Sequence, residues 1–245
     1  MKRFLPMLVS VAVLVCLGSV AQSSAADEVI KIGALYPLSG PMALLGTHDI
    51  NGVELATAFV NERGGIGGKK IKIVRADAPS PEAAISEAER LINVEKLDVI
   101  MGTYSSSLSF VASEVAEKHH KIYWETGAIA DQITKRGYKY LFRNCTQASD
   151  FGYAAADFST GTLAPAFGID VKKLKIAVMF EDSLFGTSVC SAAKERLDKA
   201  GVNVVAFESY SKKVTDLSSL VMKFRSLNPD VIIATCYVND AILWQ

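Results

Sequence analysis

Residues 98–124 read DVIMGTYSSSLSFVASEVAEKHHKIYW and contain the pattern that decides the fold. Two short apolar runs, at 99–101 and 122–124, are each typical of a buried strand. The segment between them has apolar residues at helical spacing, namely Leu108, Val111, Ala112 and Val115. A strand, a helix and a second strand in so short a span form a βαβ unit, in which the two strands lie parallel. This stretch predicts an α/β fold.

The alternation of strand and helix extends along the rest of the chain. Strands are expected to begin at residues 29, 71, 98 and 122, and again at 174, 202 and 231. Outside the first gap, the steps within each series are 24 to 29 residues long, which is the length of a βα unit. Two α/β lobes with parallel sheets and helices on both faces are therefore predicted.

The interval 140–173 breaks this rhythm. A short extended segment at 141–144 is followed by an Ala-rich helix around 149–167, which we interpret as a crossover between the lobes. We expect an N-terminal ligand-binding lobe at 27–143 and a second lobe at 144–245.

The N-terminus has the features of an export signal. Met1-Lys2-Arg3 is a basic start, residues 4–17 are apolar, and the small residues of Ser24-Ala25-Ala26 suit cleavage after Ala26. An apolar run of 14 residues is shorter than the roughly 20 that a membrane-spanning helix needs, which argues against an anchor. We predict a signal peptide at 1–26 and a periplasmic mature chain.

Composition narrows the classes of function. Half of the 245 residues are hydrophobic, 21% are charged, and 26 Lys and Arg balance 26 Asp and Glu. This excludes a disordered chain and argues against a nucleic-acid-binding protein, which has an excess of basic residues. Three cysteines follow the signal, at 145, 190 and 236, so at least one stays free or pairs with another molecule. Their wide spacing argues against a metal site.

The C-terminal end has no stop signal. A new helix is expected after Asn239-Asp240, and it ends without a cap and leaves Trp244 with little to bury it. We expect a truncated product or an incomplete gene.

Three patterns that could carry chemistry have simpler explanations. The glycines of 64–70 lack the spacing of a phosphate-binding loop and predict a helix end followed by a tight turn. His119-His120 are adjacent and point to different sides of a helix end, which argues against a metal site. The serine run 105–107 has no base that the sequence reveals, so a hydrolase is only weakly indicated.

The serine run is nevertheless the strongest functional signal. It follows a strand and opens a helix, so it lies at the carboxyl end of the parallel sheet, where ligands bind in open α/β folds. Unpaired N–H groups at a helix start, with hydroxyls beside them, suit a carboxylate. The neighbouring strand ends, at 37–47 and 125–130, contain Glu125 as their one charged residue. The pocket should suit a neutral or zwitterionic molecule with an apolar body; the alternative is that the serines only cap their helix.

Several short segments along 29–245 form a family pattern: IGALYPLSGPMALLG at 32–46, Asn51-Gly52, GGIGGKKI at 64–71, Gly102 with Ser105-Ser106, YLFR at 140–143 and Pro229-Asp230. With them the chain resembles the type I periplasmic substrate-binding proteins of ABC transporters, and among these the branched-chain amino acid (Leu/Ile/Val) receptors. The resemblance implies two α/β lobes joined by three crossovers, with the ligand closed between them. The complete family chain is longer, so the second lobe is expected to be incomplete here.

The resemblance also implies a ligand site. The carboxylate-binding serine of the family falls on Ser105, with the Ser106 amide beside it. The groups that follow the fourth strand fall on Thr126, Gly127, Ala128 and Ile129. The aromatic residue of the side-chain pocket falls on Leu45, and the ligand-facing aromatics of the second lobe fall on Phe185 and Tyr237. The acidic residue expected to hold an ammonium group lies beyond residue 245.

Three departures from the family pattern leave the solute open. Leu45 replaces an aromatic ring, Phe185 lacks the phenol that is common there, and WETGA at 124–128 is not the usual branched-chain segment. Plain core packing is the alternative role of Phe185 and Tyr237. The solute therefore stays open among amino acids, small amides and related acids.

Two classes of function follow from the resemblance. The first is a non-enzymatic receptor that closes over a small-molecule ligand and delivers it to an ABC permease in the inner membrane, with no cofactor and no metal. The second is the ligand-sensing module of an extracytoplasmic receptor. An extracytoplasmic hydrolase is third, because it needs a nucleophile and a base that the sequence does not show.

Overall fold

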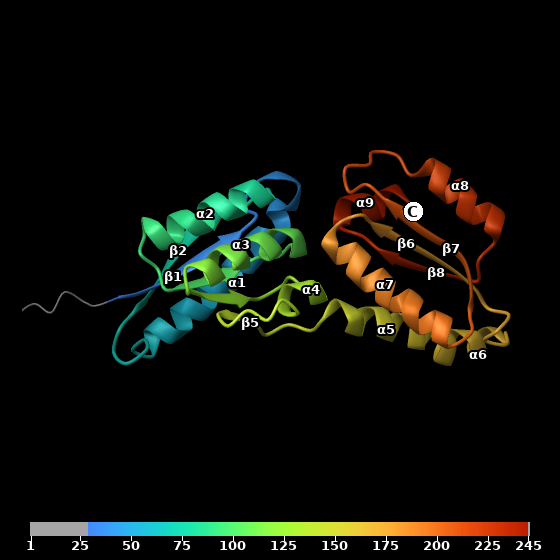
Figure 1. Ribbon diagram of the computed structural model, residues 1–245, viewed down its shortest axis with the longest axis horizontal. Coiled ribbons are helices and arrows are strands. Elements are labelled where there is room, and N and C mark those ends of the chain that lie inside the picture. The colour runs from blue at the N-terminus through green and yellow to red at the C-terminus, as the bar shows by residue number, and fades with distance from the viewer. Residues whose placement is uncertain (1–28, 245) are drawn as a thin grey trace, which may run out of the picture.

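The computed structural model describes residues 29–244, and these form two α/β halves that lie side by side along the long axis of the molecule (Figure 1). The predicted signal peptide, 1–26, lies outside the described residues. Figure 1 shows α4 (Asp131–Thr134) at the end of the first half that faces the second, and the chain passing from the first half to the second through the segment that leads into α5 (Ala148–Phe158).

The first half is built on a five-stranded parallel sheet with the strand order β2-β1-β3-β4-β5. Its strands are β1 (Ile30–Tyr36), β2 (Ile71–Asp77), β3 (Val99–Gly102), β4 (Ile122–Glu125) and β5 (Leu141–Arg143). The order changes direction between β1 and β3, so the connections that leave these two strands diverge. Divergence of that kind leaves a crevice at the carboxyl edge of the sheet.

The helices of the first half cover both faces of its sheet. They are α1 (Ala43–Glu62), which follows a 3₁₀ turn at Gly40–Met42, and α2 (Pro81–Asn93) and α3 (Ser106–Lys118). One core cluster packs Leu35 and Ile100 against Leu91 of α2 and Leu108 of α3. A second cluster packs the alternate residues of β1 against Ile50 of α1. Apolar side chains on both faces of β1 explain why the strand appears as a nearly continuous apolar run in the sequence.

The second half has a three-stranded parallel sheet with the order β7-β6-β8. Its strands are β6 (Lys175–Glu181), β7 (Asn203–Tyr210) and β8 (Val231–Thr235), and its helices include α7 (Leu184–Lys199) and α8 (Ser218–Leu227) besides α5. Ile176 and Val178 pack toward α5 and α7, whereas Ala177 and Met179 pack toward α8. The predicted α/β class with parallel sheets is confirmed. The division of the chain at 143/144 stays a prediction.

Two local expectations need correction. The Ala-rich helix is interrupted by a π-helical turn at Ser159–Leu163 before α6 (Ala164–Phe167), because Pro165 has no N–H to donate to the regular ladder. Trp244 is not left unburied: α9 (Val238–Leu243) folds back and places its ring against the cluster around Leu217 and Phe224. The tight turn at 64–70 is confirmed, since Gly64 and Gly65 have positive φ angles.

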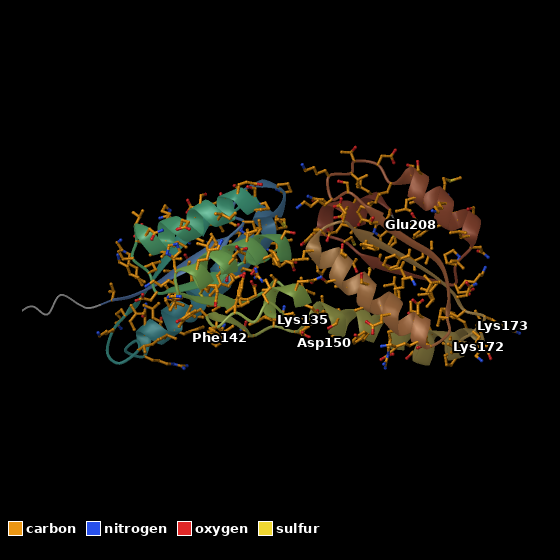
Figure 2. The ribbon with its side chains drawn as sticks, viewed as in Figure 1. Lys135, Phe142, Asp150, Lys172, Lys173 and Glu208 are labelled. Carbon is orange, nitrogen blue, oxygen red and sulfur yellow. The ribbon has the colours of Figure 1, made fainter. Side chains whose placement is uncertain are left out.

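One face of the first sheet is partly uncovered. Trp124 of β4 and Phe142 of β5 stack with their ring centroids 5.9 Å apart, and each is about two-fifths exposed. Figure 2 labels Phe142 on the lower side of the first half. Within residues 29–244, none of the helices has both the length and the apolar character needed to cross a membrane.

Candidate functional site

A cavity of about 470 Å³ lies between the two halves, at the carboxyl ends of β3, β4 and β8. The first half contributes Tyr104, Ser106, Gly127 and Ile129 to its lining, and the second half contributes Phe151, Phe185, Val189 and the segment 233–237 among others. None of the described residues that line the cavity has a charged side chain. A lining of this kind suits an apolar ligand body with a few polar groups that fix its orientation.

Aromatic rings from both halves meet at the cavity. The ring centroid of Tyr237 lies 6.3 Å from that of Tyr104 and 5.3 Å from that of Phe185. Beside them, the Ser188 hydroxyl on α7 donates to the side-chain carbonyl of Gln132 on α4, at 2.7 Å. The two halves therefore touch around the cavity, and a molecule held there is contacted from both sides.

The nine residues that the sequence assigns to a ligand site fall into two groups. Five of them line the cavity: Ser106, Gly127, Ile129, Phe185 and Tyr237. The other four do not belong to its lining: Leu45, Ser105, Thr126 and Ala128. Leu45 is half-buried on α1, and Ala128 is completely buried.

The start of α3 places its serines in different environments. Ser105 is the N-cap and is nearly buried, yet its side chain makes no capping hydrogen bond. The Tyr237 hydroxyl interacts with it across the cleft, and burial raises the pKa of that phenol. Ser106 is also buried, and its Oγ accepts a hydrogen bond from the Ala130 amide at 3.2 Å. Since the first amides of a helix have no partner inside it, the start of α3 presents N–H donors toward the cavity.

Glu125, at the end of β4, holds the loop that follows it. This side chain is completely buried, and its Oε1 accepts from the amides of Gly127 and Ala128 at 2.8 and 2.6 Å. Its Oε2 accepts from the Ser109 hydroxyl of α3. Burial raises the pKa of the Glu125 carboxyl well above its usual range, while these amide donors act in the opposite direction. The amides of Gly127 and Ala128 are therefore already used inside the protein.

The other polar groups of this loop are mostly satisfied as well. Arg143, opposite Glu125 in the sheet register, donates to the carbonyl of Ala130 at 3.0 Å. The Ile129 carbonyl accepts from the Ala148 amide at 2.8 Å. Within the described part of the chain, the Ile129 amide is the one N–H between 127 and 130 that has no acceptor in the protein. It is the loop donor that a ligand at this edge can still use.

Glu181 repeats this arrangement in the second half. It ends β6, is completely buried, and accepts from the Ser183 amide at 2.8 Å and the Gly186 amide at 2.9 Å. These groups belong to the first turn of α7, next to Phe185 in the cavity wall. One buried carboxylate thus stands directly behind each wall of the cleft.

A third acidic group lies close to the first wall. Asp49 of α1 has a buried Oδ2 with no hydrogen-bond partner among the described residues, and burial raises the pKa of its carboxyl. Burial, together with the charge of Asp49, raises the pKa of the Tyr36 and Tyr104 hydroxyls. The Tyr36 hydroxyl lies 2.8 Å from Thr126 Oγ1. Tyr36, Asp49 and Thr126 all line a second cavity, of about 390 Å³, beside α1.

Sequence reasoning missed several cavity residues. Tyr104 stands next to the serine run and is the missed residue that its position could have revealed. Phe151, Val189 and residues 233–236 come from separate elements whose convergence no local pattern shows. Within 29–244, no group of three or more His, Cys, Asp or Glu could hold a metal ion.

The sequence matches the family model described as "Periplasmic binding protein" over residues 29–244. A curated relative, "Leu/Ile/Val-binding protein homolog 7" of Brucella suis biovar 1 (strain 1330), is 42% identical over 237 residues. The match covers 97% of this chain and 59% of that relative, so the chain spans about three-fifths of the length of the curated protein.

Two solved structures have a similar fold. A branched-chain amino acid transporter substrate binding protein from Streptococcus pneumoniae, in complex with isoleucine, has a TM-score of 0.78 and 26% identity, with 87% of this chain and 59% of that chain covered. A solute binding protein of an ABC transporter from R. palustris, in complex with benzoate, has a TM-score of 0.73 and 26% identity, with 84% and 55% covered.

Proposed function

Because the chain belongs to the periplasmic binding protein family, we propose that it is an extracytoplasmic solute-binding protein of an ABC importer. It binds a branched-chain amino acid, or a related small carboxylate or amide, between its two halves and delivers it to a permease in the inner membrane. The observation that carries this proposal is the cavity between the halves, which both halves line and which, within residues 29–244, has no charged side chain in its lining. Export depends on the predicted signal, with cleavage after Ala26.

The apolar body of the ligand packs between the rings. Phe185 and Tyr237 stand on one side of the cavity and Tyr104 on the other. A ligand in contact with both sides stabilises the closed arrangement, because it gains those contacts only when the halves come together. Burial of a branched or aromatic body contributes roughly 25 cal/mol for each Å² of apolar surface removed from water.

The polar end of the ligand lies at the start of α3. The Ser105 hydroxyl, the Ser106 amide and the Ile129 amide are the donors proposed to bind a carboxylate or an amide oxygen there. We assign Thr126, Gly127 and Ala128 to shaping this edge, because the amides of Gly127 and Ala128 bind Glu125. Leu45 lies outside the cavity lining, so we propose that it does not touch the ligand and affects the site only through the position of α1.

The curated relative and the two solved structures suggest which ligands to test first. Their printed names point to leucine, isoleucine and valine on one side and to benzoate on the other. We therefore propose a panel of these four molecules together with their amides.

Isothermal titration calorimetry of the protein against this panel tests the proposal. We expect saturable 1:1 binding of at least one member and its recovery without chemical change. Phe185→Ala should weaken that binding about tenfold, because it removes a ring from the cavity wall. Phe167→Ala is the matched control, since its ring is half-exposed on α6 at the far end of the second half. Absence of binding across the panel, or conversion of the ligand, would refute the proposed function.

A further inference from the structure

One hydroxyl of the proposed ligand site already has a partner in the structure. Ser105 is nearly buried and is not part of the cavity lining, although both of its neighbours, Tyr104 and Ser106, line the cavity. Its side chain makes no capping hydrogen bond to α3, so the helix does not use this hydroxyl. The Tyr237 hydroxyl reaches Ser105 from the second half and interacts with it. Tyr237 therefore occupies the group that the oxygen of a ligand needs.

The ring of Tyr237 is fixed by its neighbours. Tyr237 is the N-cap of α9, at the end of the second half that faces the first (Figure 1). Its ring centroid lies 5.3 Å from that of Phe185 in its own half and 6.3 Å from that of Tyr104 across the cleft. Its amide donates to Asp240 Oδ1 at 2.9 Å, which holds the backbone at this point. The ring therefore belongs to the cavity wall, while its hydroxyl lies at the start of α3.

Tyr237 also has a partner in its own half. Its hydroxyl interacts with Ser183, the N-cap of α7. The Ser183 hydroxyl donates to Glu181 at 2.6 Å, so its oxygen is able to accept a hydrogen bond from the phenol. A phenol that gives up Ser105 is therefore not left without a partner, and the exchange of one serine for the other costs little free energy.

Contacts between the halves influence ligand affinity in two opposite ways. A contact that is kept when a ligand binds stabilises the bound arrangement, whereas a contact that the ligand has to break opposes binding. The hydrogen bond between Ser188 and Gln132 is of the first kind, because neither residue is part of the cavity lining. The contact between Tyr237 and Ser105 is of the second kind. Since Ser105 is nearly buried, a ligand oxygen reaches its hydroxyl only after the phenol has moved.

Resting on the proposed function, we infer that Tyr237 is a positioning residue that regulates this site: its hydroxyl occupies Ser105 while the cleft is empty, and the oxygen of a bound ligand replaces it. The phenol then turns to Ser183, and its ring remains in the wall that packs against the ligand body. The empty cleft is thus held together by a contact that its own ligand displaces. This contact lowers the affinity for every ligand that uses the Ser105 hydroxyl.

Tyr237→Phe separates the role of the hydroxyl from that of the ring. The variant keeps the ring contacts with Phe185 and Tyr104, so it should fold as the native protein does, which circular dichroism checks. Calorimetry uses the member of the proposed panel that the native protein binds most tightly. We expect Kd to fall about 2- to 10-fold in the variant, the range that corresponds to the net strength of one neutral hydrogen bond.

A double-mutant cycle tests whether Tyr237 acts through Ser105. Ser105→Ala removes the hydroxyl for which the phenol and the ligand compete, so in that background Tyr237→Phe should leave Kd unchanged. A hydroxyl that only shapes the wall would change Kd equally in both backgrounds. Tyr140→Phe is the matched control, because Tyr140 stacks on His120 directly before β5, at the edge of the first sheet opposite the cavity. Its Kd should equal that of the native protein.

The sign of the change in Kd decides the inference. Weaker binding by Tyr237→Phe means that the phenol donates to the ligand itself, and this result overturns the inference. Unchanged binding, or an equal effect in the Ser105→Ala background, overturns it as well. All of these results leave the proposed function standing. If no member of the panel binds to the native protein, the proposed function fails and the inference fails with it.

Discussion

Ser106 and Ser105 are adjacent, but the structure separates their roles, and substitution of each by alanine should show this. The Ser106 hydroxyl is the acceptor for the buried Ala130 amide at 3.2 Å. Ser106→Ala leaves that amide without a partner, which costs about 1–3 kcal/mol of folding free energy. In a chain of roughly this size, each kcal/mol lowers Tm by about 2–4 °C, so we expect a fall of about 2–12 °C.

Ser105→Ala should behave in the opposite way. Its side chain makes no capping bond to α3 and interacts with the Tyr237 hydroxyl across the cleft, so the Tm should change little. The loss should appear in ligand binding, where removal of a hydrogen bond to a charged group costs about 1–3 kcal/mol, or roughly 5- to 150-fold in Kd.

Thermal unfolding followed by circular dichroism, together with calorimetry on the same samples, measures both quantities. Ser107→Ala is the matched control, because no hydrogen bond of its side chain is present in the described residues. The reasoning is refuted if Ser106→Ala is as stable as Ser107→Ala, or if Ser105→Ala unfolds at the same reduced temperature as Ser106→Ala while it binds ligand normally.

Three further predictions concern the walls of the cleft. Gly186→Ala should lower Tm clearly more than Gly161→Ala, since a Cβ at 186 would lie 2.2 Å from the Glu181 carbonyl oxygen whereas one at 161 meets nothing; equal melting temperatures would contradict this. Because burial raises the pKa of Glu125, its contribution to stability is present below the unfolded value of 4.5 and is lost as pH rises through the raised pKa. Urea unfolding of the native protein should therefore show a loss of stability, relative to Glu125→Gln, with rising pH, and a parallel pH dependence of the two proteins would exclude it. Ser188→Ala removes the 2.7 Å hydrogen bond to Gln132 and should favour separation of the two halves, which weakens ligand binding about 2- to 10-fold. Small-angle X-ray scattering of the ligand-free protein should show a larger radius of gyration, and calorimetry should show the weaker binding. An unchanged radius and an unchanged affinity would argue against this role of Ser188.

Local patterns predicted the elements of the fold well. All seven expected strand starts agree with the structure to within one residue, for β1, β2, β3, β4, β6, β7 and β8, because a buried strand is recognisable from its own apolar run. The start of α2 was equally predictable, since the Ser80 side chain accepts from the Ala83 amide as a capping residue does. The α1 helix begins at Ala43, directly after the 3₁₀ turn at Gly40–Met42.

The candidate site was predictable only in part. The position of the serine run, after a strand and before a helix, placed Ser106 at the edge of the sheet where the cavity lies. Gly127 and Ala128 follow the next strand just as clearly, yet their amides point back to Glu125. A sequence shows that a backbone donor stands at a strand end, but it does not show which acceptor reaches that donor first.

By itself, the sequence determined the order of strands and helices, the parallel sheets and the sheet edge beside which the cavity lies, because these follow from patterns over a few residues. Only the tertiary structure decided that rings from 104, 185 and 237 meet, that Leu45 lies away from them, and that a buried carboxylate stands behind each wall. The physical reason is that hydrogen bonding and charge compensation depend on distances between groups that are remote in the chain, and those distances exist only after the two halves have folded and come together.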